Sequence, residues 1–164
     1  MYKTLFPDFD NQSKIWIYGL NKQMSNEEKI VVEKYLSEFV STWKSHGDEV
    51  TGDYRLLFNR FIVIAAKTSG ISGCSIDSSI KIFKELNQKH GLDALNLNLV
   101  YYRWDNQIKS VRRSEFANLI QLSEITTDTL VFDTSIQSLQ QLRDGKFEIA
   151  ARDSWHISLF KKVA

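Results

Sequence analysis

Six consecutive apolar residues, Phe61 to Ala66, constrain the fold of this 164-residue chain more than any other feature. A strand exposed on one face alternates apolar and polar residues, whereas a continuous apolar run is typical of a strand covered on both faces. Before it, Tyr54 and Leu56 alternate with more polar neighbours, and Asn59-Arg60 supplies a tight turn. The run therefore predicts a central strand that is entered through a hairpin.

A Gly/Ser-rich loop, residues 69–79, follows this strand and opens an amphipathic segment. That segment carries apolar residues from Ile76 to Leu86 at helical spacing and ends at Gly91, which predicts a helix. Backbone N–H groups at a helix N-terminus are a ready site for an anion. The same polar side chains could instead satisfy only their own helix start. The predicted ligand-binding residues are Ser69, Gly70, Ser72, Gly73, Ser75, Asp77 and Ser78.

The neighbouring segments complete a β-α-β-β-α-β order. Lys14–Leu20 is rich in aromatic and β-branched residues and predicts a strand. Ser25 with Glu28 forms a capping-box pattern at the start of a helix, and His46-Gly47 supplies its stop. Leu97–Trp104 predicts the last strand. The expected class is α+β, with an N-terminal arm over residues 1–13 and a ferredoxin-like core over residues 14–104.

Residues 105–164 predict a smaller β-α-β-α unit that packs on the core, so that the chain forms one compact domain. Its strands are expected over Gln107–Val111 and Thr129–Phe132, and its helices after Ser114 and Ser135. The tail from Ser154 to Phe160 is too apolar for a solvated terminus, so it is expected to dock. In an extended tail Trp155 would be the buried anchor, and His156 would face the opposite way.

Composition limits the function classes. Hydrophobic residues make up 43% of the chain, enough for a core, and 21 basic residues against 20 acidic ones give a formal charge of +1. This balance lacks the bulk electrostatic footprint of a nucleic-acid or membrane binder. A single cysteine, the lack of a signal-peptide pattern and the lack of a membrane-length apolar run favour a soluble cytoplasmic protein. The oligomeric state stays open.

Four segments together resemble a small bacterial family of uncharacterised proteins. They are Ile15-Trp16-Ile17-Tyr18, Phe58-Asn59-Arg60-Phe61-Ile62-Val63, Gly73-Cys74-Ser75-Ile76-Asp77-Ser78-Ser79 and Ser154-Trp155-His156. The likeness runs from about residue 15 to residue 157, and the third segment is its most distinctive part. Members are sometimes labelled ABC transporter ATPases, which implies a phosphate-binding loop. No G-x-x-x-x-G-K-[ST] pattern occurs in this sequence, so the resemblance implies no activity.

Residues 100–133 carry a second resemblance. The hairpin from Val100 to Val111, the short helix after Ser114 and the segment Ile125–Phe132 are similar to small GYF-type domains, which bind proline-rich peptides. The glycine-tyrosine-phenylalanine signature is missing from the sequence. A packing appendage is the favoured interpretation, because a likeness of fold does not establish a function.

Cys74 is the one candidate nucleophile. A thiol at a helix N-terminus has a lowered pKa, and catalysis would also require a base. Of the three histidines, His156 is the best candidate base, because a docked tail could return it to the loop. A buried structural cysteine is the favoured alternative. Asp77 is expected to act as a first-turn acid. The dispersed histidines show no metal-ligand spacing, so no metal site is predicted.

An RNA-binding sheet is a further alternative. Trp16 and Tyr18 occupy a strand similar to the first strand of an RNA-recognition motif, whose aromatic residues stack on bases. The run Arg60–Ala65 keeps only one aromatic residue where that motif has several, which suits a covered sheet and argues against nucleic acid. Trp16 and Tyr18 are therefore expected to be core contacts.

The sequence thus favours a non-catalytic binding protein without a cofactor. Its ligand would be a small anion, a peptide or a partner protein, bound near the Ser69–Ser79 loop. The runner-up is a thiol-dependent enzyme with Cys74 as nucleophile and His156 as base.

Overall fold

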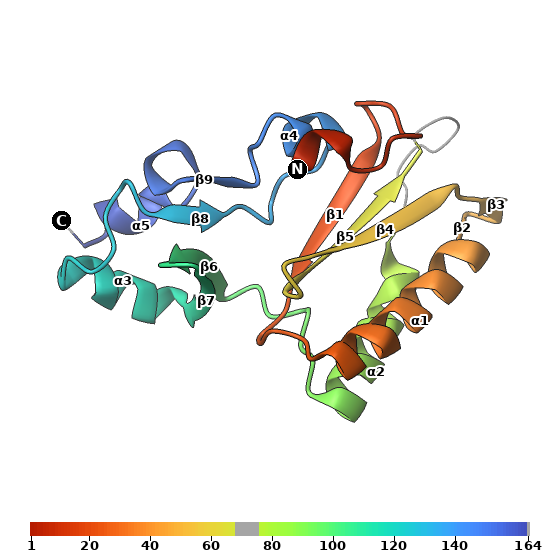
Figure 1. Cartoon of the computed structure of the whole chain (residues 1–164), viewed down its shortest axis with the longest axis horizontal. Coiled ribbons are helices and arrows are strands. Elements are labelled where there is room, and N and C mark those ends of the chain that lie inside the picture. The colour runs from red at the N-terminus through yellow and green to blue at the C-terminus, as the bar shows by residue number, and fades with distance from the viewer. Residues whose placement is uncertain (68–75, 164) are drawn as a thin grey trace.

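The described residues of the computed structural model form two main antiparallel sheets and a small two-stranded one (Figure 1). The two main sheets lie side by side, and side chains from both form one buried cluster. The structure describes residues 1–67 and 76–163. The first sheet has the order β1-β5-β4, and the second has the order β7-β6-β8-β9. The α+β class is therefore confirmed. No helix within the described residues is long and apolar enough to span a bilayer.

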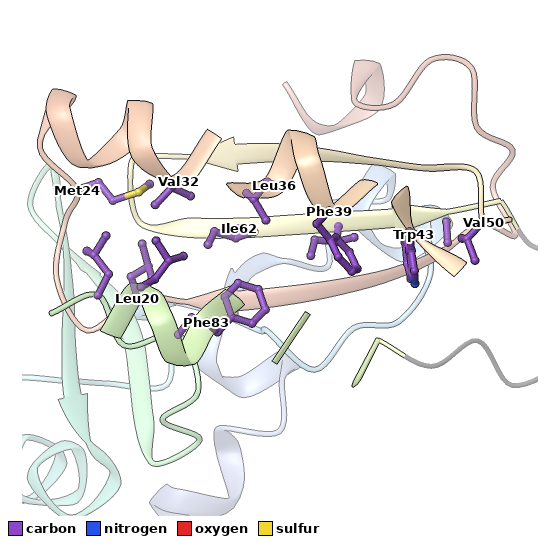
Figure 2. Close-up of a cluster of buried hydrophobic side chains, with 14 residues drawn as sticks. Leu20, Met24, Val32, Leu36, Phe39, Trp43, Val50, Ile62 and Phe83 are labelled. Atoms are coloured by element: carbon purple, nitrogen blue, oxygen red, sulfur yellow. The ribbon is translucent and has the colours of Figure 1, made fainter. Parts of the chain in front are cut away.

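The first sheet is built around β5 (Phe61–Ala66), which lies between β1 (Lys14–Gly19) and β4 (Gly52–Leu57). All six residues of β5 are buried, so the predicted central strand is confirmed. Helices α1 (Asn26–Thr42) and α2 (Asp77–His90) cover one face of this sheet. Figure 2 shows the core between them, in which side chains from both helices meet those of the sheet; its labelled members are Leu20, Met24, Val32, Leu36, Phe39, Trp43, Val50, Ile62 and Phe83.

Helix α1 begins as its sequence predicts. The amide of Glu28 donates to Ser25 Oγ at 3.1 Å, and the amide of Ser25 donates to Glu28 Oε2 at 2.9 Å, so the capping box is complete. The helix ends at Thr42, earlier than the predicted stop at His46-Gly47. Those two residues instead adopt positive φ in the tight turn of a two-stranded ribbon, β2 (Lys44–Ser45) with β3 (Asp48–Glu49).

The second sheet carries the C-terminal half of the chain. Its strands are β6 (Leu99–Trp104), β7 (Gln107–Arg112), β8 (Leu130–Phe132) and β9 (Glu148–Ala150). The remaining elements are η1 (Tyr2–Thr4), α3 (Arg113–Gln121), α4 (Leu139–Arg143), η2 (Ala151–Asp153) and α5 (Ile157–Lys161). Tyr102, Phe116 and Leu159 join β6, α3 and α5 in one buried cluster, so the tail is docked.

The ferredoxin-like arrangement is not confirmed, because β6 does not pair with β1. Beyond the end of β1, the amide of Asn21 donates to Asp93 O at 3.1 Å and the amide of Asp93 donates to Asn21 Oδ1 at 2.9 Å. These bonds fix the connection between α2 and β6 at the end of β1, so this connection runs beyond the first sheet. Strand β6 then pairs with β7 over its whole length and with β8 at Tyr102. The predicted boundary at residues 104/105 therefore falls inside a hairpin.

A second core joins the two sheets, on the face of β5 opposite the helices. The ring of Phe61 lies 5.0 Å from that of Tyr101, and 5.1 Å from each of Phe132 and Phe147. The N-terminal arm packs into the same cluster through Phe6, whose carbonyl accepts a 2.8 Å bond from Arg143 Nη2. One aromatic side chain of the central strand therefore contacts three aromatic rings of the C-terminal half.

We expect Phe61→Ala to lower the free energy of unfolding by about 3–5 kcal/mol, because it empties the point at which the two sheets meet. Leu122→Ala is the matched control, since Leu122 is 67% exposed and its truncation should change stability by less than about 0.5 kcal/mol. Urea denaturation followed by tryptophan fluorescence measures both. A loss below about 1 kcal/mol in Phe61→Ala would contradict the assignment.

Candidate functional site

Most of the predicted loop site lies outside the described residues, namely Ser69, Gly70, Ser72, Gly73, Cys74 and Ser75. Asp77 and Ser78 begin helix α2, whose N-cap residue is Ile76. Ser79 Oγ donates to Ile76 O at 2.6 Å, so this hydroxyl satisfies its own helix start. Anion binding by the loop therefore stays a prediction.

His156 lies in the second sheet's unit and is 1% exposed. Its Nδ1 is 2.7 Å from Ser154 Oγ, and its ring stacks on Trp155 at 4.0 Å. Burial lowers the pKa of His156, Asp133 opposes this shift and Arg113 adds to it, so that the pKa is about 4. Figure 1 places α5, which follows His156, at the opposite end of the molecule from the start of α2. The structure does not bring His156 to the described part of the predicted loop.

The predicted roles of Trp155 and His156 are exchanged. The segment 154–156 forms a turn that leads into α5 rather than an extended strand. This turn buries the imidazole and leaves the indole half-buried. The tail docks as expected, but its anchors are His156 and Leu159.

The outer edge of β1 is only partly paired. At its start, the amide of Leu139 donates to Ser13 O at 2.9 Å, and the amide of Ile15 donates to Gln137 O at 3.0 Å. Alternate residues of a strand direct their N–H and C=O groups to the same edge. Ile17 and Gly19 therefore face the same side as Ile15, and no described residue hydrogen-bonds to their backbone groups on that side.

A cavity of about 490 Å³ lies against this unpaired edge. One wall is β1, from Ile17 to Gly19, and the facing walls come from the α2–β6 connection and from the second sheet's unit. Leu97, on the connection, is 86% exposed beside it. The remaining lining residues are Ala94, Asn96, Leu99, Tyr101, Arg113, Thr134, Ser135 and Trp155. Such a volume is typical of ligand sites.

Tyr101 lines the cavity as an unsatisfied buried group. The residue is 4% exposed, and its hydroxyl has no hydrogen-bond partner among the described residues. Burial raises the pKa of the phenol well above its usual range, so it is a neutral donor. Its ring lies so close to Gly19 that a Cβ there would overlap it. A buried hydroxyl without a partner carries a desolvation cost that a ligand can relieve.

Arg113 is the only charged residue among those that line the cavity. Its guanidinium carbon lies 4.9 Å from the centre of the Trp155 ring, a cation–π arrangement that holds the side chain. No carboxylate in the described chain lies within 4 Å of it. Its Nη2 makes one long bond, 3.5 Å to Leu97 O. The cavity thus combines a free strand edge, an apolar rim and one cation without a carboxylate partner in the described chain.

Trp16 and Tyr18 do not form a platform for bases. They face the helix layer, where the ring of Trp16 lies 5.6 Å from that of Trp43 and the ring of Tyr18 lies 4.3 Å from that of Phe83. Within the described residues no group of three or more histidine, cysteine or acidic side chains could hold a metal ion.

Comparisons with family models, with curated proteins and with solved structures find no match for this chain. The two resemblances drawn from the sequence therefore stay predictions. The sequence did not indicate the β1 cavity, because a ferredoxin-like sheet places Leu97–Trp104 beside β1 and so fills this edge. The exposure of Leu97, which the prediction placed inside that strand, is visible only in the structure.

We expect His156 to make stability depend on pH. Its pKa is about 4 in the folded chain and 6.5 when unfolded, so between these values the unfolded chain binds more protons. The stabilisation is complete above pH 6.5 and is lost as the pH falls towards 4, by up to about 3 kcal/mol. His156→Asn should remove this part of the pH dependence.

Urea denaturation at several values between pH 4 and pH 7 tests this, with His46→Asn as the control because His46 is an exposed turn residue. The dependence of unfolding free energy on pH should be the same for His46→Asn as for the parent chain. If the profile of His156→Asn also matches, the imidazole does not titrate as a buried group.

Proposed function

We propose that this protein is a non-catalytic binding protein that accepts an extended peptide segment of a partner protein along the free edge of β1. The observation that carries the proposal is the pair of unpaired residues Ile17 and Gly19 at the wall of the β1 cavity. An exposed strand edge is a template for one more strand, and main-chain hydrogen bonds then supply affinity.

The position of this edge supports the proposal. A ferredoxin-like sheet would place its fourth strand beside β1, and here the chain supplies only the short Gln137–Leu139 segment at one end. Ile17 and Gly19 are two residues apart, which spans about 7 Å of strand. Their N–H and C=O groups offer up to four main-chain bonds to a short extended segment, and further affinity must come from its side chains.

Side-chain recognition would come from Leu97, Tyr101 and Arg113. Leu97 and Ile17, which both line the cavity, favour an apolar residue in the bound segment. Tyr101 offers its hydroxyl proton to a carbonyl. Arg113, stacked on Trp155, favours an acidic side chain or a terminal carboxylate. The preferred segment is therefore short, extended and apolar, with one negative charge.

This proposal keeps the class of function expected from the sequence and changes its location. Anion binding by the Ser69–Ser79 loop stays a separate proposal, because most of that loop lies outside the described residues. The thiol-enzyme alternative gains no support, because Cys74 is not described and His156 is buried away from the start of α2.

Selection of random seven-residue peptides displayed on phage provides the probe. We expect selected peptides to be apolar with an acidic residue, and to shift the amide resonances of Ile17 and Gly19 on binding. Arg113→Gln should weaken them about five- to tenfold, the effect of losing one partly exposed charge pair. Arg112→Gln is the matched control: it removes the same charge from an exposed neighbour outside the cavity.

Two outcomes would contradict the proposal. One is that no peptide is enriched over the background of the selection. The other is that selected peptides shift amides elsewhere and leave those of β1 unchanged, in which case a different surface binds them.

A further inference from the structure

A second cavity, of about 550 Å³, lies where the β4–β5 turn meets the β6–β7 hairpin. Polar groups dominate its lining. Arg60 lies at the end of the β4–β5 turn, whereas Arg103 on β6, Asn106 in the turn and Gln107 at the start of β7 belong to one hairpin. None of the residues that line this cavity is acidic.

Arg60 is a buried cation without a carboxylate partner in the described chain. It is 9% exposed, and burial lowers its pKa. Its Nε donates to Leu20 O at 3.1 Å, and its Nη2 donates to Asn21 O at 3.2 Å and to Ser110 Oγ. Its Nη1 makes only one long bond, 3.5 Å to Ile108 O. Carbonyl dipoles offset the desolvation of the charge in part, and Nη1 keeps capacity to donate.

Arg103 also keeps free donors. Its Nε pairs with Glu148 Oε1 at 2.5 Å, and its guanidinium lies over the rings of Phe58 and Phe132 at 5.5 and 5.4 Å. Neither terminal nitrogen has a hydrogen bond among the described residues. Two guanidinium groups thus line one cavity. Glu148 pairs with Arg103 at Nε, and its other oxygen accepts a 3.0 Å bond from the Tyr2 hydroxyl.

The backbone beside Arg60 is strained. Phe58 has φ +55° and Asn59 has φ +50°, and a bulky aromatic residue rarely adopts this left-handed region. The Phe58 ring lies under the guanidinium of Arg103, and Arg60 follows Asn59 directly in the sequence. Positive φ at two successive residues is what a tight two-residue hairpin turn requires, and this turn joins β4 to β5.

We propose that this cavity binds the phosphate group of a phosphate monoester, with Arg60 and Arg103 as its two cationic ligands. Arg60, Arg103, Asn106 and Gln107 all line the cavity, so a ligand in it can meet two guanidinium groups and two side-chain amides. A phosphate carries oxygens in three directions, whereas a planar carboxylate offers two. Arginine also binds phosphate through paired N–H groups. This site is separate from the β1 cavity and does not depend on the peptide proposal.

Titration with inorganic phosphate, followed by amide NMR at constant ionic strength, tests the site. We expect saturable shifts at Asn106 and Gln107, with a dissociation constant of about 1–10 mM. Glycerol 3-phosphate and phosphoserine are the two phosphate monoesters tested. Comparison of their dissociation constants distinguishes a small metabolite from a phosphorylated side chain as the source of the phosphate. Acetate at the same concentration should bind at least about fivefold more weakly than phosphate.

Three variants make the test sharper. Arg103→Gln should weaken phosphate binding at least about fivefold, and Glu148→Gln should tighten it about threefold because it frees Arg103 from its carboxylate. Lys109→Gln, an equal charge change on an exposed side chain of β7 outside the cavity, should stay within about twofold of the parent chain. The spectrum of each variant also reports whether it is folded.

The proposal is overturned if phosphate up to about 50 mM produces no saturable shift, since Arg60 is then only a structural link between the two sheets. It is also overturned if acetate binds as well as phosphate, or if Arg103→Gln and Lys109→Gln weaken binding equally. Equal weakening would mean that the shifts report general charge screening.

Discussion

Burial of β5 on both faces is the constraint on which the rest of the structure depends. Ile62 and Ile64 point into the core under the helices, while Phe61 and Val63 point into the core shared with the second sheet. Each face of β5 must be covered by apolar side chains, and helices α1 and α2 cover only one of the two faces. The second face is covered by aromatic residues from β6, β8 and the N-terminal arm. The C-terminal half is therefore a necessary layer of the fold, because without it Phe61 would face water.

The same requirement accounts for the unpaired edge of β1. A strand placed beside β1 would extend the first sheet but would leave the second face of β5 exposed. Strand β6 joins the second sheet instead, and its Tyr101 side chain contacts Phe61 and fills the space over Gly19. Burying this apolar surface contributes more than the few main-chain bonds that the edge forgoes, since a net hydrogen bond is worth about 1 kcal/mol and a buried aromatic ring several times that. The cavity is a consequence of covering the core.

Local signals predicted the first half of the fold well. Continuous apolarity identified β5, and Ser25 with Glu28 identified the start of α1, because both depend on neighbours in the sequence. The destination of β6 depends on bonds between Asn21 and Asp93, which are far apart in the sequence and carry no periodic signal. For the same reason, sequence could not show that Arg60 and Arg103 line one cavity.

The prediction for the tail was wrong for a different reason. The sequence showed that the tail is apolar, but an extended tail and a helical tail bury different side chains. The turn at Ser154 buries His156.

Arg60 links the two cavities structurally. Its guanidinium pairs with no carboxylate within the described chain, yet it donates to the carbonyls of Leu20 and Asn21, the two residues that follow Gly19 at the end of β1. Its carbon also lies 6.0 Å from the centre of the Tyr101 ring, and that ring lines the β1 cavity. A buried cation that makes several bonds to one strand end fixes its position far more firmly than an exposed ion pair would, because solvent does not screen those bonds. The geometry of the free edge, with Gly19 under Tyr101, therefore rests on a residue that also lines the other cavity.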